Sequence, residues 1–206
     1  MSSRPLLDRP TLSGRFVRLE PLSPTHAEAL ADAAAEDRST FGWTGVPDGL
    51  DATRRYIDTL LADADSGVVV PFCQVRVADD RPIGCTRYMD MRWWSGRDTP
   101  DEVEVGGTWL AASAQRTPIN TEAKLLIIGH AIEAWGVHRV CLATDARNER
   151  SRNAISRIGA QFEGVLRNHR FSYAPGEEGQ PRDTAVFSIT SDDWPHVRTA
   201  LMSRVR

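Results

Sequence analysis

Residues 103–135 read VEVGGTWLAASAQRTPINTEAKLLIIGHAIEAW, and this stretch decides the fold. Strand-forming residues fill its first part, up to Leu110. Polar and turn-forming residues follow over 113–120, with Pro118 where a helix can begin. From Ile119 onward, apolar residues recur at helical spacing along two stripes. The stretch therefore predicts a strand, a tight turn and a helix that is buried on most of its surface.

The start of this helix is a candidate anion site. The first N–H groups of a helix have no partner within the helix, and the helix dipole adds partial positive charge there. A strand that leads through a tight turn into a helix is therefore a natural seat for a phosphate or pyrophosphate. The alternative is an ordinary connection that binds nothing, and spacing alone favours that alternative.

Strands and helices alternate through the rest of the chain. The periodicity predicts further strands at 14–22, 68–77, 83–91, 138–144, 161–173 and 183–190. It predicts further helices at about 23–35, 51–65 and 148–158, and a short one that starts at Asp192 or Asp193. This order predicts a single domain of the α/β or α+β class.

Composition limits the classes of function. A chain of 206 residues suits one domain, although two small domains fit the length as well. With a net charge of −3, no overall field attracts nucleic acid or an anionic membrane. The start MSSRPLLDRP lacks the apolar segment of a signal peptide, and no apolar run approaches the roughly 18 residues of a membrane span.

The cysteines indicate a reducing compartment. Cys73, Cys85 and Cys141 all fall inside apolar runs. An odd number without paired spacing is typical of buried, reduced thiols in a cytoplasmic protein. No Cys/His cluster has the spacing of metal ligands, so we expect no metal site.

Several blocks of the sequence together resemble a known family. QRTPIN at 115–120 resembles the acetyl-CoA signature Q/R-x-x-G-x-G/A of the GNAT superfamily of N-acetyltransferases. GGTWL at 106–110, the block TDARNERSRNAISRIGAQFEGVLR at 144–167 and RDTAVFSIT at 182–190 resemble its RimJ/RimL-like branch. The resemblance spans about residues 12–194. It implies a GNAT domain over residues 11–206 after a flexible tail of residues 1–10. The implied fold is a mixed, twisted sheet of about seven strands with splayed central strands and flanking helices.

The resemblance implies that acetyl-CoA is the cofactor and CoA the product. Backbone N–H groups after Gln115 would hold the pyrophosphate, and β-strand residues from Thr108 would pair with the pantetheine arm. The chain departs from the signature at Pro118, which has no N–H and stands where the family has glycine. Other donors would then hold the pyrophosphate, or the affinity is reduced. The residues implied for the cofactor are Thr108, Trp109, Leu110, Gln115, Arg116, Thr117, Pro118, Ile119, Asn120, Thr121, Asn148 and Ser151.

The catalytic residues implied by the resemblance are Glu104 and Ser151. Glu104 would be the base, although Gly106-Gly107-Thr108 holds one residue more than the family pattern, which a β-bulge would absorb. Ser151 would protonate the leaving thiolate, because Ile155 stands where many members carry a tyrosine acid. The alternatives are a solvated carboxylate at 104 and a small residue at 151 that makes room for the cofactor.

Aromatic residues in loops suit an amine acceptor, and the candidates are Trp43, Tyr88, Trp93 and Trp94. The expected function is acetyl transfer to a primary amine of a small molecule, of an aminoglycoside-like compound or of a protein N-terminus. The alternative is a non-catalytic module that binds acyl-CoA or another protein. We expect no nucleic-acid or membrane partner, and homodimers are common among proteins of this resemblance.

Overall fold

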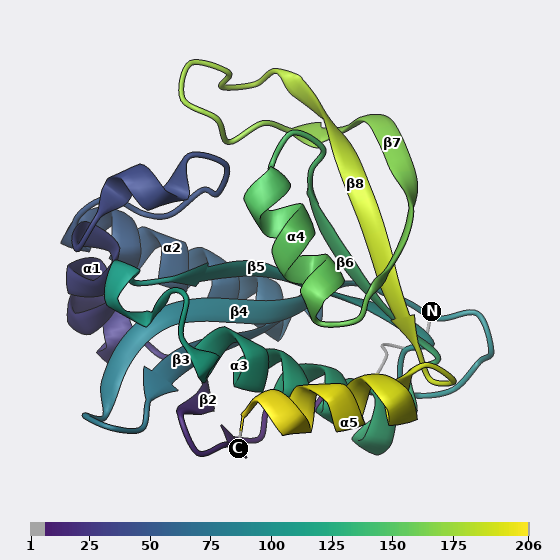
Figure 1. The fold of residues 1–206 in the computed structure, drawn as a ribbon. Coiled ribbons are helices and arrows are strands. Elements are labelled where there is room, and N and C mark those ends of the chain that lie inside the picture. Colours follow the sequence, from purple (N-terminus) through teal and green to yellow (C-terminus); the bar gives the residue numbers. More distant parts are fainter. Residues whose placement is uncertain (1–6, 206) are drawn as a thin grey trace.

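The computed structural model describes residues 7–205. An open sheet of eight strands has the order β1-β2-β3-β4-β5-β6-β8-β7 (Figure 1). The strands are β1 (Leu12–Ser13), β2 (Val17–Pro21), β3 (Val70–Arg76), β4 (Arg81–Arg92), β5 (Glu102–Leu110), β6 (Arg139–Asp145), β7 (Gln161–Phe171) and β8 (Pro181–Thr190). The α-helices are α1 (Ala27–Ala35), α2 (Leu50–Asp65), α3 (Pro118–Gly129), α4 (Glu149–Arg157) and α5 (Trp194–Arg204).

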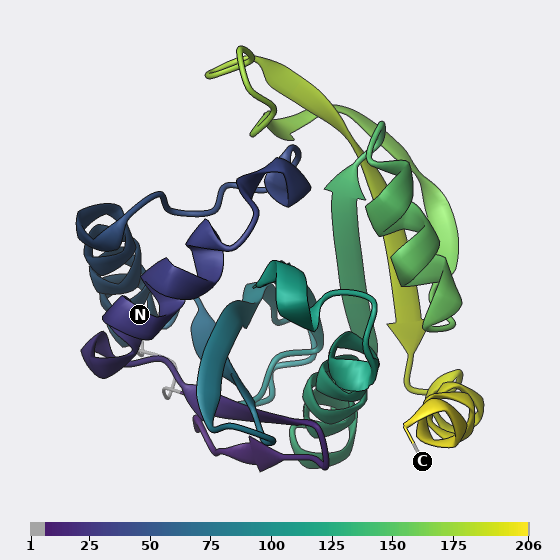
Figure 2. The same ribbon diagram turned by 60° about the vertical axis from the view of Figure 1, so that its left-hand side comes forward.

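Helices cover both faces of the sheet. Figures 1 and 2 show α1 and α2 on one face and α3, α4 and α5 on the other. The hydroxyl of Tyr88 in β4 donates a hydrogen bond of 2.5 Å to the carbonyl of Ile127 in α3, so the α3 face is tied directly to the centre of the sheet. We call the opposite face, which α1 and α2 cover in part, the α1–α2 face.

The strand, turn and helix predicted from residues 103–135 are present. Helix α3 begins at Pro118, and the side chain of Thr117 caps it by accepting a hydrogen bond from the N–H of Ile119. Proline is tolerated there because a first-turn N–H has no partner within the helix. A short π-helix, η4 (His130–Ala134), continues α3. Trp135 follows it and is buried against Tyr88.

The parallel pair at the centre of the sheet separates along its length. Hydrogen-bonded register between β5 and β6 covers only Glu102, Val103 and Glu104, opposite Arg139, Val140 and Cys141. The rest of β5, residues 105–110, has no partner on its β6 side, so the two strands form a fork. The splayed central strands expected from the resemblance are therefore confirmed.

Two expectations about the fold need adjustment. The sheet has eight strands instead of about seven, because Leu12–Ser13 adds a short edge strand next to β2. Residues 1–6 of the expected flexible tail lie outside the described residues. Within the rest of that tail, Asp8 accepts a hydrogen bond from the indole of Trp135, and Arg9 donates one to the carbonyl of Ala64.

Across residues 7–205, no helix combines the length and apolar character needed to cross a membrane.

Candidate functional site

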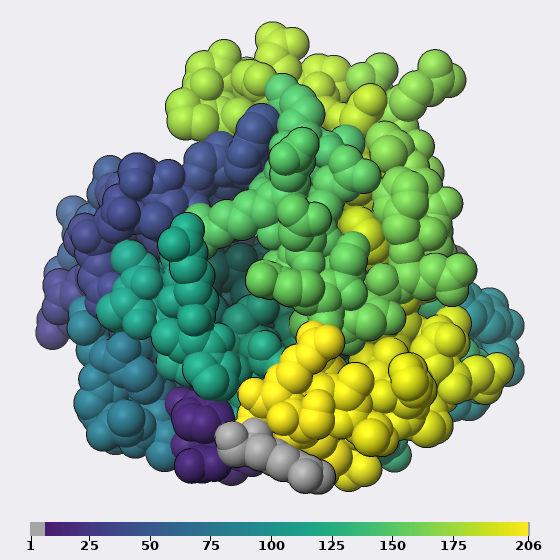
Figure 3. Space-filling view, in the orientation of Figure 1, coloured from purple at the N-terminus to yellow at the C-terminus, as the bar shows by residue number. Residues whose placement is uncertain are grey.

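The fork between β5 and β6 is the centre of the site. Edge groups of a strand that lack a partner are ready to pair with an added extended chain. Helix α3 begins close to the open end of the fork, and α4 flanks it on the same side of the sheet (Figure 2). In the space-filling view, the surface is hollowed between the teal β5–α3 connection and the green helix α4 (Figure 3). The fork is therefore a slot that is open to a ligand.

The β5–α3 connection presents donors and positive charge at the mouth of the fork. Arg116 adopts a left-handed backbone with φ of 60°, and its side chain is exposed. The N–H of Ile119 already donates to the hydroxyl of Thr117, and Pro118 has none. The backbone N–H groups of Arg116, Thr117 and Asn120 are the donors that remain for an anion. The predicted seat thus has fewer donors than a glycine at position 118 would give.

Gln115 and Arg150 bridge this connection to the rest of the site. The side-chain amide of Gln115 donates to the carbonyl of Leu110 at 2.8 Å and to the hydroxyl of Thr40 at 3.1 Å. Arg150, in the first turn of α4, donates to the side-chain oxygen of Gln115 and to the carbonyl of Thr40. Sequence reasoning missed Arg150. One feature of the sequence could have identified it. Arg150 is a cation in the first turn of a helix, where the helix dipole favours an anion instead.

Asn148 caps helix α4, at the residue where the sequence predicts this helix to begin. Its side-chain oxygen accepts the N–H of Ser151 at 3.0 Å, which leaves its NH₂ group free to donate. Ser151 lies one turn into the helix and is half-buried. Ile155 is buried on the same side of α4, so no hydroxyl stands at the position where the family tyrosine was expected.

A β-bulge shapes β5 at the fork. Between the pairs Cys85–Trp109 and Arg87–Gly106, β5 has one residue more than β4, which confirms the predicted bulge. Gly107 within it has φ of 58°, and a Cβ there would lie 2.5 Å from Cζ of Arg87. The left-handed backbone favours glycine here, and any larger residue would also have to displace the Arg87 guanidinium.

The only lysine of the chain supports this bulge from the α3 face. Lys124 is 7% exposed and donates a hydrogen bond of 2.8 Å to the hydroxyl of Thr108, which lies 2.9 Å from that of Thr86. Burial lowers the pKa of Lys124 to about 7. Of the described residues, none provides a carboxylate partner for this amine within ion-pair distance.

Glu104 lies at the base of the fork and is buried. Both of its carboxylate oxygens accept hydrogen bonds from Arg170 of β7, at 2.8 and 2.6 Å, and Arg170 also contacts Asp90. These hydrogen bonds to Glu104 raise the pKa of Arg170. The predicted base is therefore in the site, but it is held by an arginine that the sequence did not reveal.

A second ion-pair network lies at the end of β6. Arg147 binds Asp145 through both carboxylate oxygens and binds Glu177 of the β7–β8 connection. The hydrogen bonds from Arg147 lower the pKa of Glu177 to about 2. The guanidinium of Arg147 also lies over the ring of Trp43, 4.7 Å from its centroid. Of the predicted acceptor aromatics, Trp43 thus lies beside the end of β6.

The other three predicted acceptor aromatics lie elsewhere. Tyr88 is fully buried on the α3 face and belongs to the core, so its assignment to the acceptor pocket is wrong. Trp93 and Trp94 lie in the connection before β5, where the N–H of Trp94 donates to the carboxylate of Asp101. This is the end of β5 that is still paired with β6, away from the open end of the fork. Aromatic composition alone could not tell one end of β5 from the other. Trp109, by contrast, is buried in the core against Phe41.

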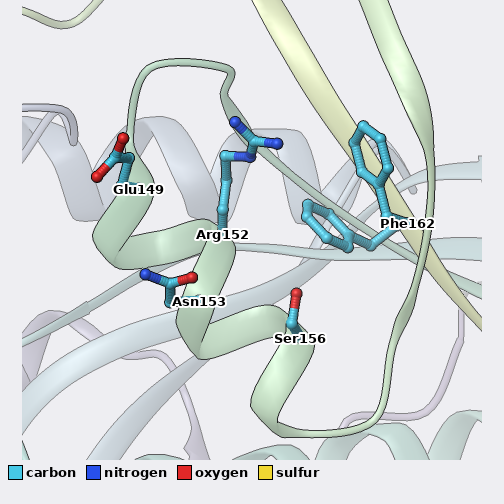
Figure 4. Close-up of a pocket in the computed structure, with 6 residues that line it drawn as sticks. Glu149, Arg152, Asn153, Ser156 and Phe162 are labelled. Carbon is cyan, nitrogen blue, oxygen red and sulfur yellow. The ribbon is translucent and has the colours of Figure 1, made fainter.

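A separate hollow of about 440 Å³ lies between α4 and the β8–β7 hairpin (Figure 4). Arg152 and Phe162 face each other across it, with the guanidinium 5.5 Å from the ring centroid. It is lined by a different side of α4 from the one that carries Ser151 and Ile155. None of the predicted site residues lines it, so it is not the predicted cofactor site.

Comparisons with known proteins agree with this geometry. The family described as Acetyltransferase (GNAT) domain matches residues 17–161. No curated protein matches the chain. Among solved structures, a GCN5-related N-acetyltransferase from Brucella melitensis is 27% identical with a TM-score of 0.81, over 98% of this chain and 88% of its own.

Two further structures share the fold. A probable acetyltransferase of the GNAT family from Chromobacterium violaceum ATCC 12472 is 27% identical, with a TM-score of 0.77 over 95% of this chain and 93% of its own. Mycobacterium smegmatis RimJ, solved in complex with CoA-disulfide, is 21% identical, with a TM-score of 0.78 over 95% of this chain and 94% of its own. At that lower identity, the likeness to RimJ concerns the fold.

Proposed function

This chain belongs to the GNAT family of acetyltransferases, and on that premise we propose that it moves an acetyl group from acetyl-CoA to a primary amine. The observation that carries the proposal is the β5–β6 fork, whose register ends at Glu104 and Cys141 while a helix begins at its mouth. Such a fork offers a strand edge to the pantetheine arm and a helix start to the pyrophosphate.

The residues of the fork fit a CoA thioester. The N–H groups of Arg116, Thr117 and Asn120 would bind the pyrophosphate, with the guanidinium groups of Arg116 and Arg150 adding positive charge. The free NH₂ of Asn148 would donate to an amide carbonyl of the pantetheine arm. The unpaired edge of β5 near Leu110 would supply the N–H that stabilises the oxyanion.

In the transfer step, the nitrogen of a neutral amine attacks the thioester carbonyl carbon, and a C–N bond forms. The C–S bond then breaks, and the thiolate leaves with a proton from Ser151 or from water. The amine loses a proton to Glu104 or to a water that Glu104 holds. For that role Arg170 has to release one oxygen of Glu104, or Glu104 has to act through the water.

One observation favours a second candidate function. Arg170 donates hydrogen bonds to both oxygens of Glu104, so this carboxylate at the base of the fork forms an ion pair of the kind that stabilises structure. A module that binds acyl-CoA without turning it over would keep the fork and need no base. This candidate predicts cofactor binding with no amine-dependent loss of thioester.

Thermal unfolding with and without acetyl-CoA tests the first requirement. A ligand at about one hundred times its dissociation constant adds roughly 2.7 kcal/mol, which raises the Tm of a chain of this size by roughly 5 to 10 °C. No shift with acetyl-CoA, CoA or longer acyl-CoAs would refute both candidates.

Release of CoA in the presence of an amine panel separates the two candidates. The three cysteines are buried, so a thiol reagent reports CoA with little background. If the protein is an enzyme, the rate of CoA release should fall at least tenfold in Glu104→Gln. It should be unchanged in the control Glu28→Gln, because Glu28 is an exposed residue of α1. Binding without release across the panel would favour the non-catalytic module.

A further inference from the structure

Arg182 is a buried arginine without a partner in the site. It lies on β8 directly opposite Arg170 of β7, so the two side chains project from the same face of the hairpin. It is 8% exposed, and its Nε is buried without a hydrogen-bond acceptor. Within residues 7–205, its guanidinium makes neither a hydrogen bond nor an ion pair.

The carboxylates nearest to Arg182 are already engaged. Asp145 and Glu104 are close enough for their charges to act on Arg182, yet neither comes within ion-pair distance of it. Asp145 is bound by Arg147 through both oxygens, and Glu104 is bound by Arg170 through both oxygens. Asp145 and Glu104 therefore each have their own arginine, and Arg182 is left without a carboxylate partner.

A second unpartnered group lies next to Arg182. Thr184 is two residues along β8, so its side chain projects from the same face. It is fully buried, and its hydroxyl has no hydrogen-bond partner. Thr184 is opposite Asp145 in the sheet register, which places the pair of unpartnered donors beside the end of β6.

Arg87 adds a third group on this side of the sheet. It is opposite Gly106, and its guanidinium lies over Gly107 of the bulge. Its Nε is also buried without an acceptor. Arg87 and Arg182 therefore come from strands on opposite sides of the fork, β4 and β8, and both lack a carboxylate partner.

A buried guanidinium without a partner is costly, because it has lost water and gained no acceptor. Burial lowers the pKa of Arg182, although an arginine keeps its charge at neutral pH. Among residues 7–205, no hydrogen bond or ion pair compensates this cost, and the charges of Asp145 and Glu104 offset only part of it. A bound anion would compensate it, because a carboxylate accepts two parallel hydrogen bonds from one guanidinium.

We propose that the amine acceptor of this protein carries a carboxylate, and that Arg182 binds this carboxylate with help from the hydroxyl of Thr184. This inference rests on the proposed function, because it names the substrate class of the same site. The CoA phosphates have their own seat at the start of α3, with Arg116 and Arg150. Arg182 is within electrostatic range of Glu104, on the β8 side of the fork.

The charges of the site favour a carboxylate over a phosphate. Glu104, Asp145 and Arg170 all act electrostatically on Arg182, but Arg170 is paired with Glu104 and Arg147 with Asp145. The single charge of the remaining guanidinium, that of Arg182, matches a carboxylate better than a phosphate dianion. The carboxylates of Glu104 and Asp145 favour the ammonium form of an incoming amine. A molecule with one amine and one carboxylate matches this mixed surface better than a polyamine or an aminoglycoside, which are purely cationic.

Matched acceptors test the proposal. Leucine is compared with leucinamide and isopentylamine, and phenylalanine with phenylalaninamide and phenethylamine, by CoA release over a range of pH. The amide and the decarboxylated amine bracket the amine pKa of the amino acid, so basicity alone cannot explain a preference for the acid. A dipeptide with aspartate or asparagine in second place distinguishes an acidic peptide N-terminus from a free amino acid.

The wild-type protein is expected to favour the carboxylate members by tenfold or more in kcat/KM, mainly through KM. Arg182→Gln and Arg182→Met are expected to remove that preference while leaving release from the amines that lack a carboxylate within about twofold. Arg157→Gln, an exposed arginine of α4, is the matched control and keeps the preference. Both Arg182 variants should have a Tm equal to or above that of the wild type, because an unpaired buried charge is removed.

Direct binding keeps the test independent of turnover. The same acceptors are titrated by calorimetry into the protein saturated with CoA. Tenfold tighter binding of the carboxylate members, lost in Arg182→Gln, supports the proposal even if no acetyl transfer occurs. Equal binding or release for acid and amide, or a preference that survives in Arg182→Gln, overturns the proposal and leaves acetyl transfer to other amines standing.

Discussion

Lys124 gives a prediction whose size follows directly from the structure. Its amine is buried between α3 and β5, with the hydroxyl of Thr108 as its hydrogen-bond partner at 2.8 Å. Burial lowers its pKa from 10.5 to about 7. The unfolded chain therefore binds more protons than the native state at pH values between these two.

The sign of the effect follows from this difference in proton binding. Stability rises with pH wherever the unfolded state binds more protons, so Lys124 makes the native state more stable as pH rises from about 7 to 10.5. Below about pH 7 both states are charged, and the full cost of burying the charge is present. At about 1.4 kcal/mol per pH unit, that cost reaches roughly 5 kcal/mol.

Lys124→Met removes the titrating group and keeps an apolar chain of similar length. The variant should be more stable than the wild type below pH 7, and its advantage should shrink by about 2 kcal/mol between pH 7.5 and 9. Urea unfolding of both proteins at each pH measures this, and the difference between them cancels the other titrating groups.

The single lysine also permits a direct measurement. With lysine labelled by ¹³C at Cε, the chain gives one side-chain signal, because Lys124 is its only lysine. The chemical shift of that signal should titrate near pH 7. A titration near the ordinary pKa of 10.5, together with a stability difference that does not change with pH, would show that burial does not lower the pKa of Lys124.

Three further substitutions have defined outcomes. Pro118→Ala restores a backbone N–H at the mouth of the fork. The dissociation constant of CoA, measured by calorimetry, should therefore fall roughly fivefold. An unchanged constant would show that this N–H does not bind the cofactor. Gly107→Ala places a Cβ on a residue with φ of 58°, 2.5 Å from Cζ of Arg87. The free energy of unfolding measured in urea should therefore fall by about 1 to 2 kcal/mol or more. Wild-type stability would mean that the bulge can relax. Asn148→Ala removes the cap of α4, so the free energy of unfolding in urea should fall by about 1 kcal/mol, and CoA should bind more weakly. A loss of stability without weaker CoA binding would mean that Asn148 only caps the helix.

Local sequence signals were enough to predict the main strands and helices around the candidate site. The strand and helix on either side of residues 113–120 follow from periodicity, and Asn148 follows from the preference of asparagine for helix caps. The bulge at Gly106-Gly107-Thr108 was predictable because this segment holds one residue more than the family pattern. Each of these signals depends on residues within a few positions of one another.

The contacts that set the charge of the site could not be predicted in this way. Arg170 is 66 residues from Glu104 in the chain, and the β7–β8 hairpin brings them together. Tyr88 was placed in a pocket because its side of β4 was not known, and a strand exposes its residues on alternating faces. That Arg182 lacks a partner depends on which arginine binds which carboxylate, and only the packed structure decides this.

Amide hydrogen exchange in the presence and absence of CoA tests the central claim, that the fork between β5 and β6 is the cofactor slot. Pairing of the pantetheine arm with the unpaired edge of β5 should slow the exchange of N–H groups in residues 105–110, and pyrophosphate binding should slow that of residues 116–121. If the fork binds CoA, slower exchange will be confined to these two segments and the start of α4. Unchanged exchange there, or slowing confined to the hollow between α4 and Phe162, would contradict it.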